Sequence, residues 1–512
     1  MKPNAFFALL FVSSYAGAQE VSPAVLAARE FREEYGSAIL RSFAELLRVP
    51  NVASDRVNIR RNAEWISELF AQRGVEMELW NQEGAPPIVY GRLDSNAGDP
   101  AQAPTYGIYV HYDGQPVASD EWTNPPWEPV LYTREYHAGG VRRDWPSSGE
   151  TIDPEWRIYA RAAGDDKAPL PALLTALDAL SKAGIARTAN IVFFFEGEEE
   201  VGSPHLEAYL DAHHERLDVD AWFICDGPVH QSRRPQLVFG VRGITSFELT
   251  VYGATRGLHS GHYGNWAPNP GEMLARLLSS MKDASGKVLV EGFYDTVTPL
   301  GAAERQALAE IPEVDQALMR EFGLARTEAD GKLSARLLLP SLNIRGLTSG
   351  RTGAEARNVI PGTAVASMDV RLVRGNEPAH MLDLIEAHIA AQGYHIVRDE
   401  PDLDTRLAHP RIARIRRGGG YVAARASMDH PVVGPLVKAA TMAAGTAPVM
   451  VPSLGGSLPL YLFTKYDNVP VIVVPIANHD NNQHAPDENL RIANLWYGID
   501  LFTALLTMEP HR

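Results

Sequence analysis

The stretch that decides the fold is Ile191 to Pro204, IVFFFEGEEEVGSP. The apolar, partly β-branched and aromatic run from Ile191 to Phe195 is typical of a buried strand, and a Gly-Ser-Pro turn closes the stretch. Between them stand four glutamates: Glu196, Glu198, Glu199 and Glu200. Neighbouring carboxylates repel and raise one another's pKa values unless a cation neutralises some and a proton-transfer role uses another. Taken alone, the stretch fits a solvated acidic loop equally well.

Four further strand-like runs also end in residues of the kind that bind metals. Tyr106–Val110 leads to His111 and Asp113, Arg157–Arg161 to Asp165 and Asp166, Ala221–Cys225 to Asp226, and Val469–Ile476 to His479 and His484. Each has an ordinary reading, such as a histidine capped by an aspartate or an aspartate at a helix N-terminus. Strands that alternate with helices predict an α/β fold with a mostly parallel sheet, in which ligands gather at the carboxyl ends of strands.

The other patterns predict how the chain is divided. Helical spacing appears at 37–47, 58–73, 269–281 and 377–392, while Trp and Pro in residues 117–156 indicate a surface excursion beside the site. Residues 242–426 have the separated strands and helices of an α+β unit. We expect them to be inserted into a catalytic domain formed by residues 19–241 and 427–512. The arginines between Arg411 and Arg417, followed by three glycines, are interpreted as a loop.

The N-terminal sequence and the composition limit the cell compartment and the binding partners that we expect. Lys2, an apolar segment and Ala16-Gly17-Ala18 predict a signal peptide over residues 1–18, hence a secreted, periplasmic protein. No later run reaches the roughly 18 apolar residues of a membrane span. The single cysteine, Cys225, leaves metal binding to histidines and carboxylates. The formal charge of −16 argues against nucleic acid or an anionic membrane as partner.

The motifs, in their order along the chain, resemble those of the two-zinc peptidases and amidohydrolases. That family includes carnosinases, bacterial glutamate carboxypeptidases, aminoacylases and succinyl-diaminopimelate desuccinylase, and the carnosinase-type dipeptidase branch is the most similar. The matching segments cover nearly the whole chain after residue 18: HYDGQP (111–116), GDDK (164–167), EGEEEVGS (196–203), Asp226, LHSG (258–261), NVIPG (358–362), MDVR (368–371), LGGS (454–457) and HAPDENL (484–490).

The resemblance implies a catalytic domain with an inserted lid and dimerisation domain, and a set of metal ligands. His111, Asp165 and Asp226 would hold one divalent ion; Asp165, Glu200 and His484 would hold the other. Zn²⁺ suits imidazole and carboxylate, with Mn²⁺ or Co²⁺ as alternatives. Glu199 would be the general base, and Asp113 would orient His111. The Asp165–Asp166 peptide bond would be cis.

The resemblance also implies roles for the lid. His259 would reach the active site of the partner in a homodimer and stabilise an oxyanion. Arg371 would bind a substrate carboxylate, helped by Gly456 and Ser457. The neighbouring His262 and His479 compete with His259 and His484, and the motif positions favour the latter pair.

We therefore expect a metal-dependent hydrolase that cleaves the amide bond of dipeptides or a C-terminal residue. An N-acyl-amino-acid amidohydrolase is the alternative, because both substrates present an amide near a carboxylate. A catalytically dead binding protein of this fold is disfavoured, because all five ligands and Glu199 are present. Ala160, Ala162 and Ala168 stand where the family usually has glycine, and the excursion at 117–156 is longer than usual. These departures concern specificity more than chemistry.

Overall fold

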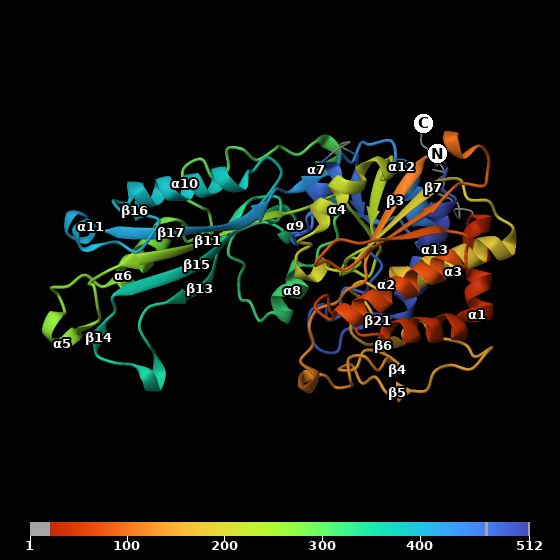
Figure 1. The fold of residues 1–512 in the computed structure, drawn as a ribbon, viewed down its shortest axis with the longest axis horizontal. Coiled ribbons are helices and arrows are strands. Elements are labelled where there is room, and N and C mark those ends of the chain that lie inside the picture. Colours follow the sequence, from red (N-terminus) through yellow and green to blue (C-terminus); the bar gives the residue numbers. More distant parts are fainter. Residues whose placement is uncertain (1–20, 466–468, 510–512) are drawn as a thin grey trace, which may run out of the picture.

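The computed structural model describes residues 21–465 and 469–509, so the predicted signal peptide at 1–18 lies outside the described residues. Figure 1 shows two lobes joined side by side, one built around β3 and β7 and the other around β11 and β15. The first and the last described helix, α1 and α13, both lie in the first lobe. No described helix is both long and apolar enough to span a membrane.

An eight-stranded mixed sheet forms the centre of the first lobe, in the order β1-β2-β7-β3-β8-β20-β9-β19. Its four middle strands, β7, β3, β8 and β20, run parallel. The bounds are β1 Glu76–Trp80, β2 Ile88–Leu93, β3 Thr105–His111, β7 Asn190–Glu196, β8 Ala221–Ile224, β9 Gln236–Val238, β19 Val449–Val451 and β20 Val471–Val473. Three of the predicted strands thus form the sheet centre at nearly the predicted positions, and β20 is shorter than the predicted run.

Helices cover both faces of this sheet. Alternate residues of β3 and β7, such as Ile108 and Phe193, face one core with helices α1, α2, α3, α12 and α13, whereas Tyr109 and Phe194 face a second core with α4. The bounds are α1 Pro23–Leu47, α2 Arg56–Ala71, α3 Pro169–Ala183, α4 Leu206–His213, α12 Val433–Ala444 and α13 Ile492–Leu506. Burial on both faces explains the continuous apolar runs, because a strand covered on both sides has no polar face.

A separate four-stranded antiparallel sheet corrects two predictions. It comprises β21 Asn489–Arg491, β6 Arg157–Tyr159, β4 Val130–Tyr132 and β5 Arg142–Arg143, in that order. The predicted strand at 157–161 therefore does not join the main sheet, and the excursion at 117–156 contributes two strands instead of only a surface loop. β6 pairs with β21 because the three buried residues of each strand offer a complete antiparallel register.

The second lobe is a five-stranded sheet, β13-β15-β11-β17-β16, backed by α6 and α10. The bounds are β11 Gly243–Tyr252, β13 Ser341–Thr348, β15 Thr363–Leu372, β16 His395–Val397, β17 Ile412–Tyr421, α6 Pro270–Ser280, α10 Pro378–Ala391 and α11 Leu403–Ala408. At its far end lie β12 Leu258–His259, α5 Ser260–Tyr263 and β14 Val359–Ile360.

The arginine-rich stretch before the three glycines was wrongly interpreted as a loop, because it is strand β17. Arg417 forms ion pairs with Asp383 and Glu386 of α10, which neutralise the charge on this side of the strand. A side chain at Gly420 would collide with the main-chain oxygen of Ile244 on β11, so glycine permits the close approach of the two strands.

Three short helices between α6 and β13 lie between the two lobes: α7 Ala302–Glu310, α8 Asp315–Glu321 and α9 Leu333–Arg336. Ala307 and Ile311 pack into the cores of the first lobe. Two-residue strands, β10 Gly240–Val241 and β18 Ala424–Arg425, pair where the chain enters and leaves the second lobe. The stretch 242–426 therefore contacts the first lobe as well as forming its own sheet.

Candidate metal centre

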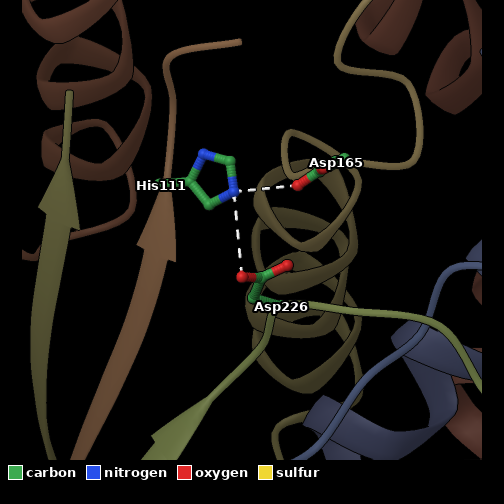
Figure 2. A group of neighbouring side chains, drawn as sticks. All are labelled: His111, Asp165 and Asp226. Atoms are coloured by element: carbon green, nitrogen blue, oxygen red, sulfur yellow. Dashed lines mark hydrogen bonds and ion pairs between the residues drawn. The ribbon is translucent and has the colours of Figure 1, made fainter. Parts of the chain in front are cut away.

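The first ligand group lies where three segments converge at the carboxyl edge of the main sheet. His111 is the last residue of β3, Asp226 follows β8, and Asp165 lies in the turn before α3. Figure 2 shows their side chains pointing toward one another, with His111 Nε2 2.9 Å from Asp165 Oδ1 and 4.0 Å from Asp226 Oδ2. All three residues are buried. One imidazole and two carboxylates therefore face a common point.

The second ligand group shares Asp165 with the first. His484 Nε2 lies 3.1 Å from Asp165 Oδ2 and 3.1 Å from Glu200 Oε2. Within each group of three residues, one ligand atom per residue lies within 4.8 Å of the others. Asp165 therefore has one oxygen toward each group, as a bridging carboxylate requires. The Asp165–Asp166 peptide bond is cis.

Asp113 connects the end of β3 to the glutamate turn after β7. Its carboxylate lies 3.4 Å from His111 Nδ1 and accepts the main-chain N–H groups of Glu199 and Glu200, each at 3.1 Å. The contact to Nδ1 leaves Nε2 of His111 free to face Asp165 and Asp226, the other two members of the first ligand group. Asp113 thus positions one ligand directly and the turn that carries Glu199 and Glu200 through its backbone.

The crowded carboxylates shift one another's protonation. Burial, and next the Asp165 carboxylate, raise the pKa of Asp226 to about 7, with His111 opposing. Desolvation and the Asp226 and Glu200 carboxylates hold the pKa of Glu199 well above its usual range, with His111 opposing. Hydrogen bonds to Asp165 and Glu200 raise the pKa of His484 to about 10. Such shifts are characteristic of sites that bind cations or transfer protons.

The donor set fits two divalent cations. Asp226 Oδ1 is buried and has no hydrogen-bond partner among residues 21–465 and 469–509, which is unfavourable unless a cation takes that oxygen. Imidazole nitrogen and carboxylate oxygen are ligands that Zn²⁺ accepts, and a shared carboxylate is compatible with a pair of ions. His111, Asp165 and Asp226 would hold one ion, and Asp165, Glu200 and His484 the other.

Two residues beside the ligands were not singled out from the sequence, although both lie in quoted motifs. Gln115 donates from Nε2 to Glu200 Oε2 at 2.8 Å. Glu488 is fully buried, four residues after His484 in HAPDENL. The sequence shows that this glutamate lies close to the proposed ligand His484. It does not show the hydrogen-bond partners of Glu488, because they are distant in the chain.

Glu488 holds the turn that carries Asp165. Its Oε1 accepts the main-chain N–H groups of Gly164 and Asp165, both at 2.9 Å. Its Oε2 accepts the N–H of Ala162 at 2.9 Å and Arg161 Nη1 at 2.8 Å. Ala162 has a φ of 62°, a conformation that favours glycine, so this hydrogen bond helps to hold an unfavourable backbone. One carboxylate therefore connects the segments of two proposed ligands, Asp165 and His484.

Replacing Glu488 by Gln is expected to weaken metal binding. The amide places an N–H₂ group against donors, so at least one main-chain N–H near Asp165 loses its acceptor. Loss of such a supporting contact typically lowers metal affinity by about 10–100-fold. Metal titration of the variant, with Glu64→Gln as a control at an exposed ion-paired carboxylate, measures the effect. Unchanged affinity in folded Glu488→Gln would contradict this role.

The residues predicted to bind the substrate and the oxyanion lie in two places. Arg371 Nη1 donates to Ser457 Oγ at 2.7 Å, and the neighbouring Gly456 accepts the N–H of Arg242 at 3.0 Å. Tyr421 lies near both Arg371 and Glu199: its pKa is raised by burial and then by the Glu199 charge, while Arg371 opposes. His259, by contrast, is exposed next to α5, at the end of the second lobe remote from β3 and β7.

The rival histidines are placed differently from one another. His262 is exposed beside His259, with ring centroids 4.5 Å apart, so the two imidazoles share one loop. His479 belongs to neither ligand group among the described residues, and its Nδ1 lies 3.9 Å from Asp480. Of His479 and His484, the structure brings only His484 to Asp165.

The fold and the paired ligand groups define an α/β metallohydrolase with an inserted second lobe. The model of peptidase family M20/M25/M40 matches residues 107–508, and the chain belongs to this family. It is therefore a metal-dependent peptidase.

Individual relatives agree with this assignment. The chain is 30% identical to the Cys-Gly metallodipeptidase of Candida albicans over 419 residues, covering 80% of this chain and 78% of that protein. It is 26% identical to the human Beta-Ala-His dipeptidase, covering 82% and 76% of the two chains. An M20 family metallo-carboxypeptidase from Sulfolobus solfataricus superposes with a TM-score of 0.72 at 28% identity, covering 91% and 98%.

Proposed function

We propose that the protein is a secreted peptidase that cleaves dipeptides, or releases a C-terminal residue, with two divalent metal ions and Glu199 as general base. The observation that carries this proposal is the pair of ligand groups that share Asp165, with Glu199 in the same turn as Glu200. The names of the dipeptidase relatives and of the metallo-carboxypeptidase support a short peptide as substrate.

When bound, the divalent ions, Zn²⁺ foremost, lower the pKa of a water molecule and polarise the scissile carbonyl. Glu199 accepts the proton of the attacking water and delivers it to the leaving amine. Asp113 fixes the main chain of this turn and so keeps the Glu199 carboxylate beside the ligands.

The lid supplies binding and specificity in this proposal. Arg371, already hydrogen-bonded to Ser457, binds the carboxylate at the substrate's C-terminal end, and Gly456 leaves room for its approach, since no atom lies within 4 Å of a side-chain carbon built there. His259 lies directly before α5, at the end of the second lobe remote from β3 and β7. It therefore acts in the partner of a homodimer, where it donates to the developing oxyanion.

Metal stoichiometry tests the centre of the proposal. Protein lacking residues 1–18 should bind two divalent ions per chain, because the carboxylates around Asp165 repel when no cation is present. Elemental analysis gives the stoichiometry, and chelation should abolish activity that Zn²⁺, Mn²⁺ or Co²⁺ restores. Full activity with at most one specific ion per chain would rule out the two-metal mechanism.

The substrate class is tested with paired substrates. Dipeptides, longer peptides and N-acyl amino acids should be supplied to the same metal-loaded enzyme. Peptidase activity predicts that kcat/KM is highest for a dipeptide with a free C-terminal carboxylate and falls for its amide. A preference for N-acyl amino acids would instead support the amidohydrolase alternative.

Export to the periplasm rests on the sequence of residues 1–18. N-terminal sequencing of the protein recovered from its native cell fraction should begin at Gln19. An intact N-terminus in the cytoplasmic fraction would contradict export.

A further inference from the structure

Four arginines are buried in the described part of the chain, and one of them differs from the rest. Three lie beside carboxylates: Arg157 with Asp480 at 2.7 Å, Arg161 with Glu488 at 2.8 Å, and Arg491 with Glu155 at 3.2 Å. Arg242, only 6% exposed, has no carboxylate within 4.0 Å among residues 21–465 and 469–509. A buried charge without a carboxylate in contact is unfavourable, and such a guanidinium is suited to bind an anionic group from outside the chain.

The contacts of Arg242 leave part of its guanidinium unsatisfied. Nη2 donates to Leu339 O at 2.8 Å and to Ser341 Oγ at 3.0 Å, while Nε is buried without a partner in the described structure. Burial, and next the nearby Arg371, lower its pKa to about 10, with the Asp369 carboxylate opposing, so the group remains charged at neutral pH. A planar guanidinium with free N–H capacity is well suited to a carboxylate.

Arg242 lines a hollow between the second lobe and helices α8 and α9. Its volume of about 380 Å³ lies within the usual range for small-molecule sites, about 300–1,000 Å³. The walls are largely apolar, with side chains that include Leu318, Met319, Phe322, Leu324 and Leu337. Phe322 and Leu324 are 62% and 49% exposed, so the hollow presents apolar surface that a ligand could cover.

Charges in the hollow favour an anion. Lys282 and Arg336 line it together with Arg242, against Asp315 and Glu328. Glu328 is already paired with Lys282 at 2.7 Å, and Asp315 accepts the main-chain N–H of Leu333 at 3.0 Å. Neither Arg242 nor Arg336 has a carboxylate within 4.0 Å among the described residues, although the Asp369 charge acts on Arg242 from farther away.

We propose that this hollow is a second binding site, which takes a small carboxylate with an apolar body, such as an apolar amino acid of the kind that peptide hydrolysis releases. The carboxylate lies on Arg242 and the apolar body against α8 and α9. The hollow adjoins the proposed binding site of the substrate carboxylate. The main-chain N–H of Arg242 donates to the carbonyl oxygen of Gly456, and Ser341 on β13 lies opposite Arg371 on β15. A small molecule bound here is therefore separate from the metal-binding residues, yet it contacts residues next to Arg371.

Calorimetric titration of the metal-loaded full chain tests the site with 4-phenylbutyrate and its uncharged amide as probes. The acid should bind at least about 10-fold more tightly than the amide, because a charge-assisted hydrogen bond is lost with the amide. Arg242→Met should remove this preference. Leu318→Trp, which puts a larger side chain into the wall of the hollow, should abolish binding of both probes while Arg242 stays in place.

Arg276→Met, an exposed arginine on the second lobe, is the matched control and should bind the acid like the parent. Circular dichroism establishes that each variant is folded, and if Arg242→Met is not, Leu318→Trp decides. Binding of the acid that survives Leu318→Trp places the probe elsewhere, at the metals for example, and overturns the proposal. Equal affinity for acid and amide in the parent, or no binding of the acid, overturns it as well.

Discussion

Glu199→Gln is expected to lower turnover by a factor of about 10²–10⁴ while both metal ions stay bound. The amide has nearly the shape of the carboxylate but cannot accept the proton of the attacking water. The turn should keep its geometry, because Asp113 holds the main-chain N–H of Glu199 and not its side chain. The measurement is kcat on a dipeptide, together with the metal content of the variant.

The adjacent glutamate provides the matched control. Glu200 faces His484 at 3.1 Å and belongs to the second ligand group, so Glu200→Gln should lose affinity for one ion. Activity of Glu200→Gln should return in part at high metal concentration, whereas that of Glu199→Gln should not. A Glu199→Gln variant as active as the parent would exclude Glu199 as the base.

His259→Ala is expected to be nearly inactive although folded, dimeric and metal-loaded. Removal of one oxyanion donor typically costs about 2.7–4 kcal/mol of transition-state stabilisation, or roughly 10²–10³ in kcat. The side chain is exposed, and the hydrogen bond that it accepts comes from the nearby Gly261 N–H at 3.1 Å, so its loss should not disturb the fold. His262→Ala, on the same loop, is the control and should retain activity.

Mixing variants tests whether His259 acts across the dimer. A heterodimer of His259→Ala and Glu199→Gln has one site with both defects and one with neither, provided that His259 acts in the partner. Activity should therefore rise when the two inactive proteins exchange subunits. Confirmed heterodimers without recovery, or a fully active monomer, would leave His259 acting within its own chain.

The sequence by itself determined the centre of the fold and predicted the residues that the structure brings together as candidate metal ligands. The sequence predicts β3, β7 and β8 because strands buried on both faces are continuously apolar. His111 ends β3, and Glu200 and Asp226 follow β7 and β8 within a few residues. The parallel arrangement then places these strand ends at one edge, a consequence of local pattern and connection alone. The motif positions were sufficient to prefer His484 over His479.

Only the tertiary structure decided where the supporting contacts lie. Asp165 comes from a turn beside a separate antiparallel sheet, because β6 pairs with β21 near the end of the chain and not with β3. Similarly, β17 is a strand because α10 supplies Asp383 and Glu386 to Arg417.

Glu488 and Arg242 show the same limit most clearly. Whether a buried charge stabilises or destabilises the fold depends on which groups surround it, and those groups come from distant parts of the chain. Glu488 meets the main chain of Gly164, 324 residues away, whereas Arg242 meets no carboxylate among the described residues. Local sequence cannot distinguish these two outcomes, because each is set by long-range packing that brings a partner to the charge or withholds it.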